Sequence, residues 1–145
     1  MTQQANEVVQ QASEEEIYVL IKHHKFYLPS IVPAVIDGQL DRYKVRLVDA
    51  YSFTHPATLN HHIIPEGYTF DGASIPWWCW SALRVHPLSN RVLIAALVHD
   101  YLYEIRCNRK QADKLFMDLL IGAGMTEQKA KLFWSAVRAA GWLYY

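Results

Sequence analysis

The sequence predicts an α+β protein in which a small antiparallel sheet of short N-terminal strands is followed by three helices. Two observations indicate this order. The stretch from residue 17 to residue 70 contains β-branched and aromatic runs interrupted by Pro and Gly, which is typical of short strands. From residue 89 onward, apolar residues recur at helical spacing, with capping residues between the runs. Strands followed by helices are the usual order of α+β domains.

The composition fits one domain with a polar extension. The chain has 145 residues, of which 52% are hydrophobic and 19% are charged, and this is enough to bury a substantial core. Residues 1–16 are rich in Gln, Glu, Ala and Ser. We therefore expect a flexible polar arm over residues 1–16 and a single α+β domain over residues 17–145.

Charge and cysteine content exclude several classes of protein. The 14 basic and 14 acidic residues cancel, so we expect no binding to nucleic acid, and the charge does not support contact with a membrane. The two cysteines are too few for a disulfide framework and fit a reducing compartment. The sequence shows neither a signal peptide nor a transmembrane segment. We expect a protein that is made and kept in solution.

Four runs in the first half of the chain predict the strands. They are IYVLI, KFYLPSIVPAVI, RYKVRLVDAYSF and HHIIPEGYTF. Pro33, the Asp37-Gly38 pair and Pro56 are expected to bound them, because proline and glycine interrupt strands. We expect these strands to pair in antiparallel fashion.

The second half predicts three helices with recognisable ends. The first extends from about Ser89, which is a plausible N-cap, to about Ile105. Asn108 can cap the second helix, RKQADKLFMDLLI, which ends near Gly122. Thr126 opens the third, TEQKAKLFWSAVRAAG, with Met125 before it in the position of a hydrophobic staple.

A stretch at the end of the first helix, LVHDYLYEIRCNRKQADKLF, contains the candidate chemistry. Helix positions four apart share a face, so His99 aligns with Tyr103 whereas Asp100 points to another side. The short turn that follows returns the second helix antiparallel and brings Asp113 opposite His99. A carboxylate in this position fixes the tautomer of the imidazole. We expect His99 to act as a base, oriented by Asp113 and Tyr103.

Asp100 is then available to bind a cation together with the preceding loop, FDGASIP. In this loop Asp71 offers a carboxylate, Gly72 allows the backbone to approach closely, and Ser74 offers a hydroxyl. These are hard oxygen ligands, which suit calcium or magnesium better than zinc. The sequence thus suggests a divalent cation at Asp100 and Asp71, with Gly72 and Ser74 as further candidates.

Three motifs, IIPEGYTFDGASIPWWCW, AALVHDYLY and RKQADKLF, follow one another along the chain. Together they resemble a phage and prophage family of unknown function that carries TDxASIP, HDYLY and AD motifs in the same order. The resemblance covers roughly Tyr43 to Trp142, and Phe70 stands where that family usually has Thr. It implies a phage context among virion or lysis genes, with the protein in the virion or in the bacterial host cytoplasm.

A more distant resemblance is to the HDxxY and later Asp of calcium-dependent secreted phospholipases and their viral-capsid relatives. In that scheme the histidine activates water, the adjacent aspartate holds calcium, and the later aspartate and the tyrosine orient the histidine. The matching residues here are His99, Asp100, Asp113 and Tyr103. The glycine-rich calcium loop and the disulfides of those enzymes have no counterpart in this sequence, which leaves calcium and a lipid substrate open.

The metal-dependent HD phosphohydrolases also carry a His-Asp pair on a helix. They need an additional upstream histidine and a distant downstream aspartate on helices of an all-α bundle. Here His86 precedes Pro87 in an expected loop, and Asp113 follows the pair too soon. This scheme therefore ranks below the two resemblances above.

The same residues also have purely structural interpretations. His99, Asp100 and Asp113 fit a buried polar network that locks two helices in register, and Asp71 with Ser74 fits an Asx-type turn. Aromatic residues in two clusters fit core or subunit contacts. These are Trp77, Trp78, Trp80, Trp142, Tyr144 and Tyr145.

Two hypotheses of different classes follow. The first is a phage-encoded hydrolase in which the His99 site cleaves an ester or amide during phage entry or lysis, with calcium or magnesium beside it. The second is a non-catalytic virion component of the tail, neck or baseplate, in which these residues hold the fold. In that case the aromatic patches would bind other virion proteins or further copies of the same chain.

Overall fold

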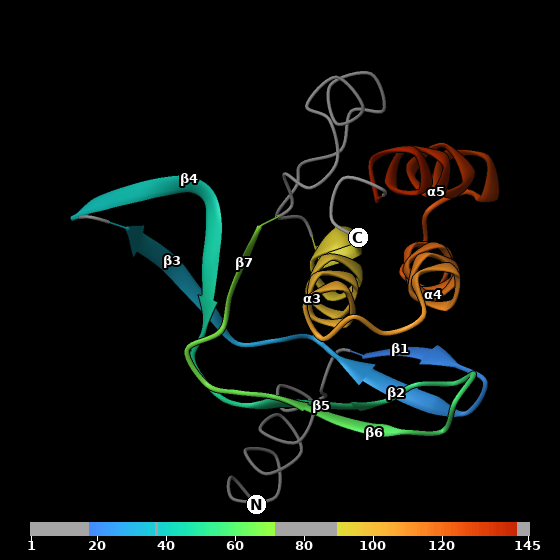
Figure 1. Cartoon of the computed structure of the whole chain (residues 1–145), viewed down its shortest axis with the longest axis horizontal. Coiled ribbons are helices and arrows are strands. Elements are labelled where there is room, and N and C mark those ends of the chain that lie inside the picture. The colour runs from blue at the N-terminus through green and yellow to red at the C-terminus, as the bar shows by residue number, and fades with distance from the viewer. Residues whose placement is uncertain (1–17, 37, 72–89, 142–145) are drawn as a thin grey trace, which may run out of the picture.

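The computed structural model describes residues 18–36, 38–71 and 90–141. Within these residues strands come first and helices follow, as predicted for an α+β protein (Figure 1). The strands are β1 (Tyr18–Ile21), β2 (His24–Tyr27), β3 (Ile31–Ile36), β4 (Gln39–Leu47), β5 (Tyr51–Thr54), β6 (His61–Ile64) and β7 (Thr69–Asp71). The helices are α3 (Asn90–Glu104), α4 (Arg109–Gly122) and α5 (Glu127–Gly141).

All strand pairs in the described residues are antiparallel, but they form three small sheets instead of one. The sheets have the strand orders β1-β2, β3-β4-β7 and β5-β6. Three of the predicted runs are each divided into two strands. The run HHIIPEGYTF, for example, breaks at Pro65 and at Gly67, whose φ of +85° forms a turn.

Pro33 does not bound a strand, contrary to the expectation from sequence. It lies inside β3, opposite Val45, and the register of β3 against β4 shifts between Pro33 and Val35. Strand β3 is at the edge of its sheet. A proline is tolerated at such a place because an edge strand and a bulge each leave a backbone position that needs no N–H donor.

The second and third helices begin at the residues that the sequence predicts. The Asn108 side chain accepts a hydrogen bond from the backbone N–H of Gln111 at 3.0 Å. The Thr126 hydroxyl accepts one from the N–H of Lys129 at 3.3 Å. Both are N-caps, which satisfy backbone donors that the first helical turn leaves unpaired. Ser89, the predicted cap of the first helix, lies outside the described residues.

The core is centred on α3. Every residue from Val92 to Val98 is buried, as expected for a helix that is covered on all sides. Helix α4 packs between α3 and α5, and α3 also contacts β7. Figure 1 shows α3 and α4 above the β1–β2 and β5–β6 hairpins. This packing fixes the orientation of α3 and α4, which carry the candidate site.

The β1–β2 hairpin lies against the end of α4 at a glycine. A Cβ atom at Gly122 would lie 2.5 Å from Cγ1 of Val19 and 3.2 Å from Cδ1 of Ile21. A side chain at residue 122 would therefore collide with β1. The glycine allows the hairpin to pack closely on α4 and positions the β1–β2 turn beside that helix.

Several predictions concern residues that the structure does not describe. They are the polar arm 1–16, the loop residues Gly72 and Ser74, and the aromatic residues Trp77, Trp78, Trp80, Trp142, Tyr144 and Tyr145. Among the described residues, no helix combines the length and apolar character that crossing a membrane requires.

Candidate functional site

His99 and Asp113 meet across the interface of α3 and α4. His99 Nε2 lies 2.8 Å from Oδ1 of Asp113. The two side chains are 4% and 0% exposed. The turn between the helices contains Arg106 with a φ of +55°, and it returns the chain so that the second helix packs along the first. The contact between His99 and Asp113 that the sequence predicts is therefore present.

Tyr103 completes this cluster on the α3 side. Its hydroxyl donates a hydrogen bond to the same Oδ1 of Asp113 that His99 contacts. The centroids of the His99 and Tyr103 rings are 4.2 Å apart, and the Phe116 ring of α4 lies 4.8 Å from the His99 ring. The imidazole is thus held by one hydrogen bond and by two aromatic rings. The predicted alignment of His99 with Tyr103 on one face of the helix agrees with this contact.

The second oxygen of Asp113 is occupied by arginine side chains. Nη1 of Arg138, from α5, donates to Oδ2 at 3.1 Å. Nε of Arg109 lies 3.9 Å from the same oxygen. Arg109 also donates to the backbone carbonyl of Arg138, while its Nε is buried without a hydrogen bond among the described residues. Asp113 therefore links three helices.

The interpretation of the sequence missed both arginines, although Arg109 carried a local signal. Arg109 precedes Asp113 by four residues, which places the two side chains on one face of α4. Arg138 carried no such local signal, because it reaches Asp113 through the packing of α5 on α4. A buried carboxylate predicted between helices requires such a positive partner.

The contacts of Asp113 determine its charge. Burial acts to raise the pKa of this carboxyl, but hydrogen bonds from His99, Tyr103 and Arg138 outweigh burial and hold the pKa below its ordinary value. The pKa of Tyr103 is raised by burial and by its hydrogen bond to Asp113. At neutral pH the cluster therefore contains an ionised carboxylate and a neutral phenol.

An ionised Asp113 also determines which ring nitrogen of His99 carries the proton. A carboxylate can only accept hydrogen bonds, so the contact at 2.8 Å requires a proton on Nε2. In the neutral ring the other nitrogen, Nδ1, then holds a lone pair. No hydrogen bond to Nδ1 forms within the described parts of the chain. An imidazole in this tautomer can take a proton from water or a hydroxyl at Nδ1.

Asp100 lies on a different side of α3 and is partly buried. Burial raises the pKa of the neighbouring Tyr68, and the negative charge of Asp100 and a hydrogen bond with Glu104 raise it further. The two carboxylates, one helical turn apart, thus approach the same phenol. Asp100 does not share the face of His99, as the sequence predicts.

The other predicted cation ligands are not assembled by the described residues. Asp71 ends β7, where its backbone pairs with Lys44, and β7 packs against α3. Its side chain, Gly72 and Ser74 lie outside the described part of the structure. Among the described residues, no three His, Cys, Asp or Glu side chains are grouped as a metal site would require, whereas calcium takes six to eight oxygen ligands.

The comparisons with known proteins bear on the chain as a whole. A family model described as "Protein of unknown function (DUF1353)" matches residues 45–137. Comparison with curated proteins and with solved structures finds no significant match. The matched range contains both helices of the His99 cluster and Arg138 lies one residue beyond it. Because the match spans more than half of the chain, this protein belongs to the DUF1353 family, whose function is unknown.

Proposed function

We propose that this protein is a hydrolase of ester or amide bonds in which His99 is the general base. The observation that carries the proposal is the hydrogen bond between Nε2 of His99 and the ionised Asp113 at 2.8 Å. It leaves Nδ1 as the basic nitrogen. A histidine oriented by a carboxylate in this way is a recurrent device of general base catalysis.

The roles of the residues follow from their contacts. Nδ1 of His99 removes a proton from water as the water oxygen attacks the carbonyl carbon. The imidazolium that forms is stabilised by Asp113 and then gives the proton to the leaving oxygen or nitrogen. Tyr103 and Arg138 hold the carboxylate of Asp113 in place and ionised. With 4% of the side chain exposed, His99 acts only on a group that reaches its Nδ1 edge.

The context of the reaction is part of the proposal and rests on resemblance. The three motifs of the phage and prophage family suggest a role in phage entry or host lysis. The resemblance to the calcium-dependent secreted phospholipases supports an acyl ester as the substrate class, because His99, Tyr103 and Asp113 are connected as that scheme requires. We also propose a calcium or magnesium ion at Asp100 and Asp71, but no step above depends on it.

A second function is favoured by a separate observation, the nearly complete burial of His99 and Asp113. Asp113 is 0% exposed and has polar partners on α3 and α5, with Arg109 of α4 nearby. A network of this kind also suits a non-catalytic virion component that needs rigid helix packing. In that case the protein would bind other virion proteins or copies of itself, and no hydrolysis would be found.

A substitution that removes the base without removing the hydrogen bond separates the two functions. His99→Gln keeps an N–H donor that can reach Asp113, but it has no nitrogen able to accept a proton. Hydrolysis of phospholipid vesicles, peptidoglycan, a p-nitrophenyl ester and a phosphodiester would be measured for the wild type and the variant. We expect one acyl substrate to be cleaved and kcat to fall at least about 100-fold in the variant.

The matched control is Tyr101→Phe on the same helix. The Tyr101 hydroxyl contacts the backbone carbonyl of Ile63 at 3.4 Å and none of the residues of the cluster. We expect its kcat to stay within about twofold of the wild type and both variants to melt within a few degrees of it. Equal activity of His99→Gln and wild type, or no hydrolysis of any acyl substrate, would reject the proposal.

A further inference from the structure

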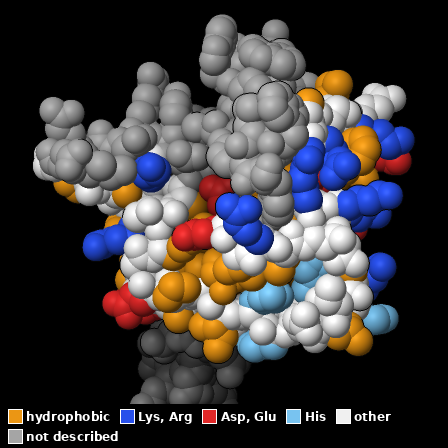
Figure 2. All heavy atoms as spheres, viewed as in Figure 1, with side chains coloured by type: hydrophobic (Ala, Val, Ile, Leu, Met, Phe, Trp, Pro, Cys, Tyr) orange, Lys and Arg blue, Asp and Glu red, His pale blue; other side chains and the backbone are white. Residues whose placement is uncertain are grey.

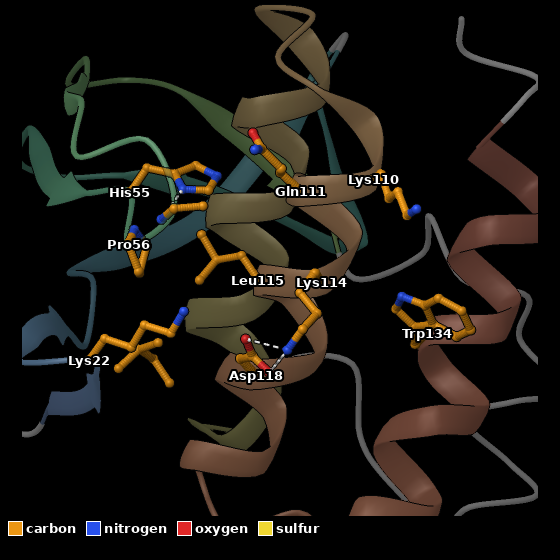
Figure 3. A pocket seen from close by; sticks show the side chains of 11 residues that line it. Lys22, His55, Pro56, Lys110, Gln111, Lys114, Leu115, Asp118 and Trp134 are labelled. Atoms are coloured by element: carbon orange, nitrogen blue, oxygen red, sulfur yellow. Dashed lines mark hydrogen bonds and ion pairs between the residues drawn. The ribbon is translucent and has the colours of Figure 1, made fainter.

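A pocket of about 300 Å³ opens on the outer face of α4. Its walls come from α4, from Trp134 of α5, from the turn at Lys22 between β1 and β2, and from the segment at His55 after β5 (Figure 3). Leu115 and Trp134 contribute apolar surface, and most of the lining is apolar. Small-molecule sites have this character, in which a mostly apolar cavity carries a few placed polar groups.

This pocket is separate from the His99 cluster. Asp113 points from α4 towards α3 and α5, where its partners lie. Lys114, Leu115 and Asp118 line the pocket from positions that diverge from Asp113 by about 100° or more around the helix, whereas Lys110 diverges by about 60°. A ligand in the pocket would therefore touch a different face of α4 from a substrate at His99.

The charge of the pocket is positive. Lys114 forms an ion pair with Asp118, with Nζ at 3.0 Å and 3.1 Å from the two carboxylate oxygens. Lys22 and Lys110 form no ion pair within the described residues. Figure 2 shows Lys and Arg side chains gathered on the side of the molecule where Figure 1 places α4 and α5. The three lysines against one aspartate leave an excess positive charge at an apolar cavity.

Lys110 lies one helical turn before Lys114, so two positive charges are neighbours on α4. Like charges at this spacing repel and destabilise an isolated helix slightly. A bound anion between them would relieve the repulsion. The helix therefore carries a small cost that binding of a negative group would reduce.

His55 supplies a neutral donor on the opposite wall. The side chain is 3% exposed, and its Nδ1 accepts a hydrogen bond from the backbone N–H of Ala57 at 3.1 Å. Burial, and then the charge of His62, lower the pKa of His55, so at neutral pH the ring is uncharged and carries its proton on Nε2. Figure 3 shows the Nε2 edge turned towards α4. This N–H can donate to a ligand oxygen.

We propose that the pocket binds a small carboxylate that carries an aromatic or short aliphatic group. The carboxylate oxygens would lie between Lys110 and Lys114, and the apolar group would pack on Leu115 and Trp134. The volume admits only a small ligand. This inference is independent of the hydrolase proposal, since no residue of the His99 cluster lines the pocket.

The test is a titration of the full chain with 4-phenylbutyrate, followed by ¹H–¹⁵N NMR. Backbone amides of residues 110–118 and the indole N–H of Trp134, assigned with a Trp134→Phe variant, report binding. We expect a Kd of about one millimolar or lower. The double variant Lys110→Ala, Lys114→Ala should bind about tenfold more weakly, because two exposed charge contacts are lost. Lys131→Ala, an exposed lysine of α5 outside the pocket, should bind like the wild type.

Two further probes separate the apolar and charged contributions. The neutral amide 4-phenylbutyramide and the small anion acetate should each bind at least about tenfold more weakly than 4-phenylbutyrate. Equal binding of the amide would show that the lysines do not recognise the anion. Equal binding of acetate would show that the apolar lining is not used. Either of these results would overturn the inference. So would an unchanged Kd in the double variant, or chemical-shift changes confined to residues outside the pocket.

Discussion

The two faces of α4 differ in how their charged side chains are paired. The inner face carries Asp113 and packs against α3 and α5, and the outer face lines the pocket. On the inner face, Asp113 is 0% exposed and is balanced by His99, Arg138 and Arg109. On the outer face, Lys110 has no ion-pair partner among the described residues, and the pair of Lys114 with Asp118 is open to solvent. On the inner face, the charge of Asp113 thus holds three helices and the His99 imidazole in place. On the outer face, the lysine charges remain available to a ligand.

The largest effect that this comparison predicts comes from neutralising the inner carboxylate. Asp113→Asn leaves Arg138 and Arg109 without their negative partner, and we expect the free energy of unfolding to fall by about 3 kcal/mol. The matched change on the outer face, Asp118→Asn, should cost less than about 1 kcal/mol because its partner Lys114 is exposed. Urea denaturation of both variants measures the difference. Equal costs would contradict the comparison.

A smaller effect is expected where the β1–β2 hairpin supports the outer face. Gly122→Ala places a methyl group 2.5 Å from Cγ1 of Val19, and we expect a loss of about 1–3 kcal/mol in the free energy of unfolding. Combining it with Val19→Ala should cost less than the sum of the two single changes, because the collision is removed. Additive costs in chemical denaturation would mean that β1 does not pack on Gly122.

The two faces should also differ on acidification. The pKa of Asp113 in the folded state lies below its ordinary value of 3.8. Its stabilising contribution is therefore present above that pH and is lost as the pH falls through the lower folded-state pKa. We expect wild type and Asp118→Asn to lose this contribution below about pH 4, whereas Asp113→Asn lacks it. Melting temperatures between pH 2 and pH 7 test the prediction, and identical pH profiles for all three proteins would refute it.

The smallest effect is expected from a substitution at the N-cap of α4, because the cap stabilises the helix that carries both faces. Asn108→Ala removes the hydrogen bond to the N–H of Gln111, and we expect a loss of about 1 kcal/mol. Asn108→Ser retains a side-chain acceptor and should cost no more than a few tenths of that value. If thermal unfolding gives the two substitutions the same cost, the cap does not contribute as described.

The sequence predicts the helical half of the molecule better than the strand half. Helix starts at Asn108 and Thr126 are fixed by local hydrogen bonds, and the contact of His99 with Asp113 follows from helical spacing and a short turn. The strands depend on distant partners. Pro33 lies inside β3 because β3 pairs with β4, and the predicted runs divide because their two parts pair with different strands, which no local pattern specifies.

In the candidate site, too, contacts set by spacing along one helix can be predicted, whereas contacts set by packing between distant elements cannot. Spacing along one helix aligns His99 with Tyr103 and would also have revealed Arg109, since it precedes Asp113 by one turn. Arg138 reaches Asp113 only through the packing of α5 on α4. The buried His55 was missed because its environment is built by two loops and a helix that lie far apart in the sequence.

The central claim is that Asp113 holds a proton on Nε2 of His99 and leaves Nδ1 as the nitrogen that accepts a proton. Long-range ¹H–¹⁵N NMR of the imidazole at neutral pH, assigned with His99→Gln, measures the protonation of each ring nitrogen directly. We expect a proton on Nε2 and an unprotonated Nδ1. A proton on Nδ1 in the neutral ring, with Nε2 unprotonated, would contradict both the hydrogen bond to Asp113 and the role of His99 as a base.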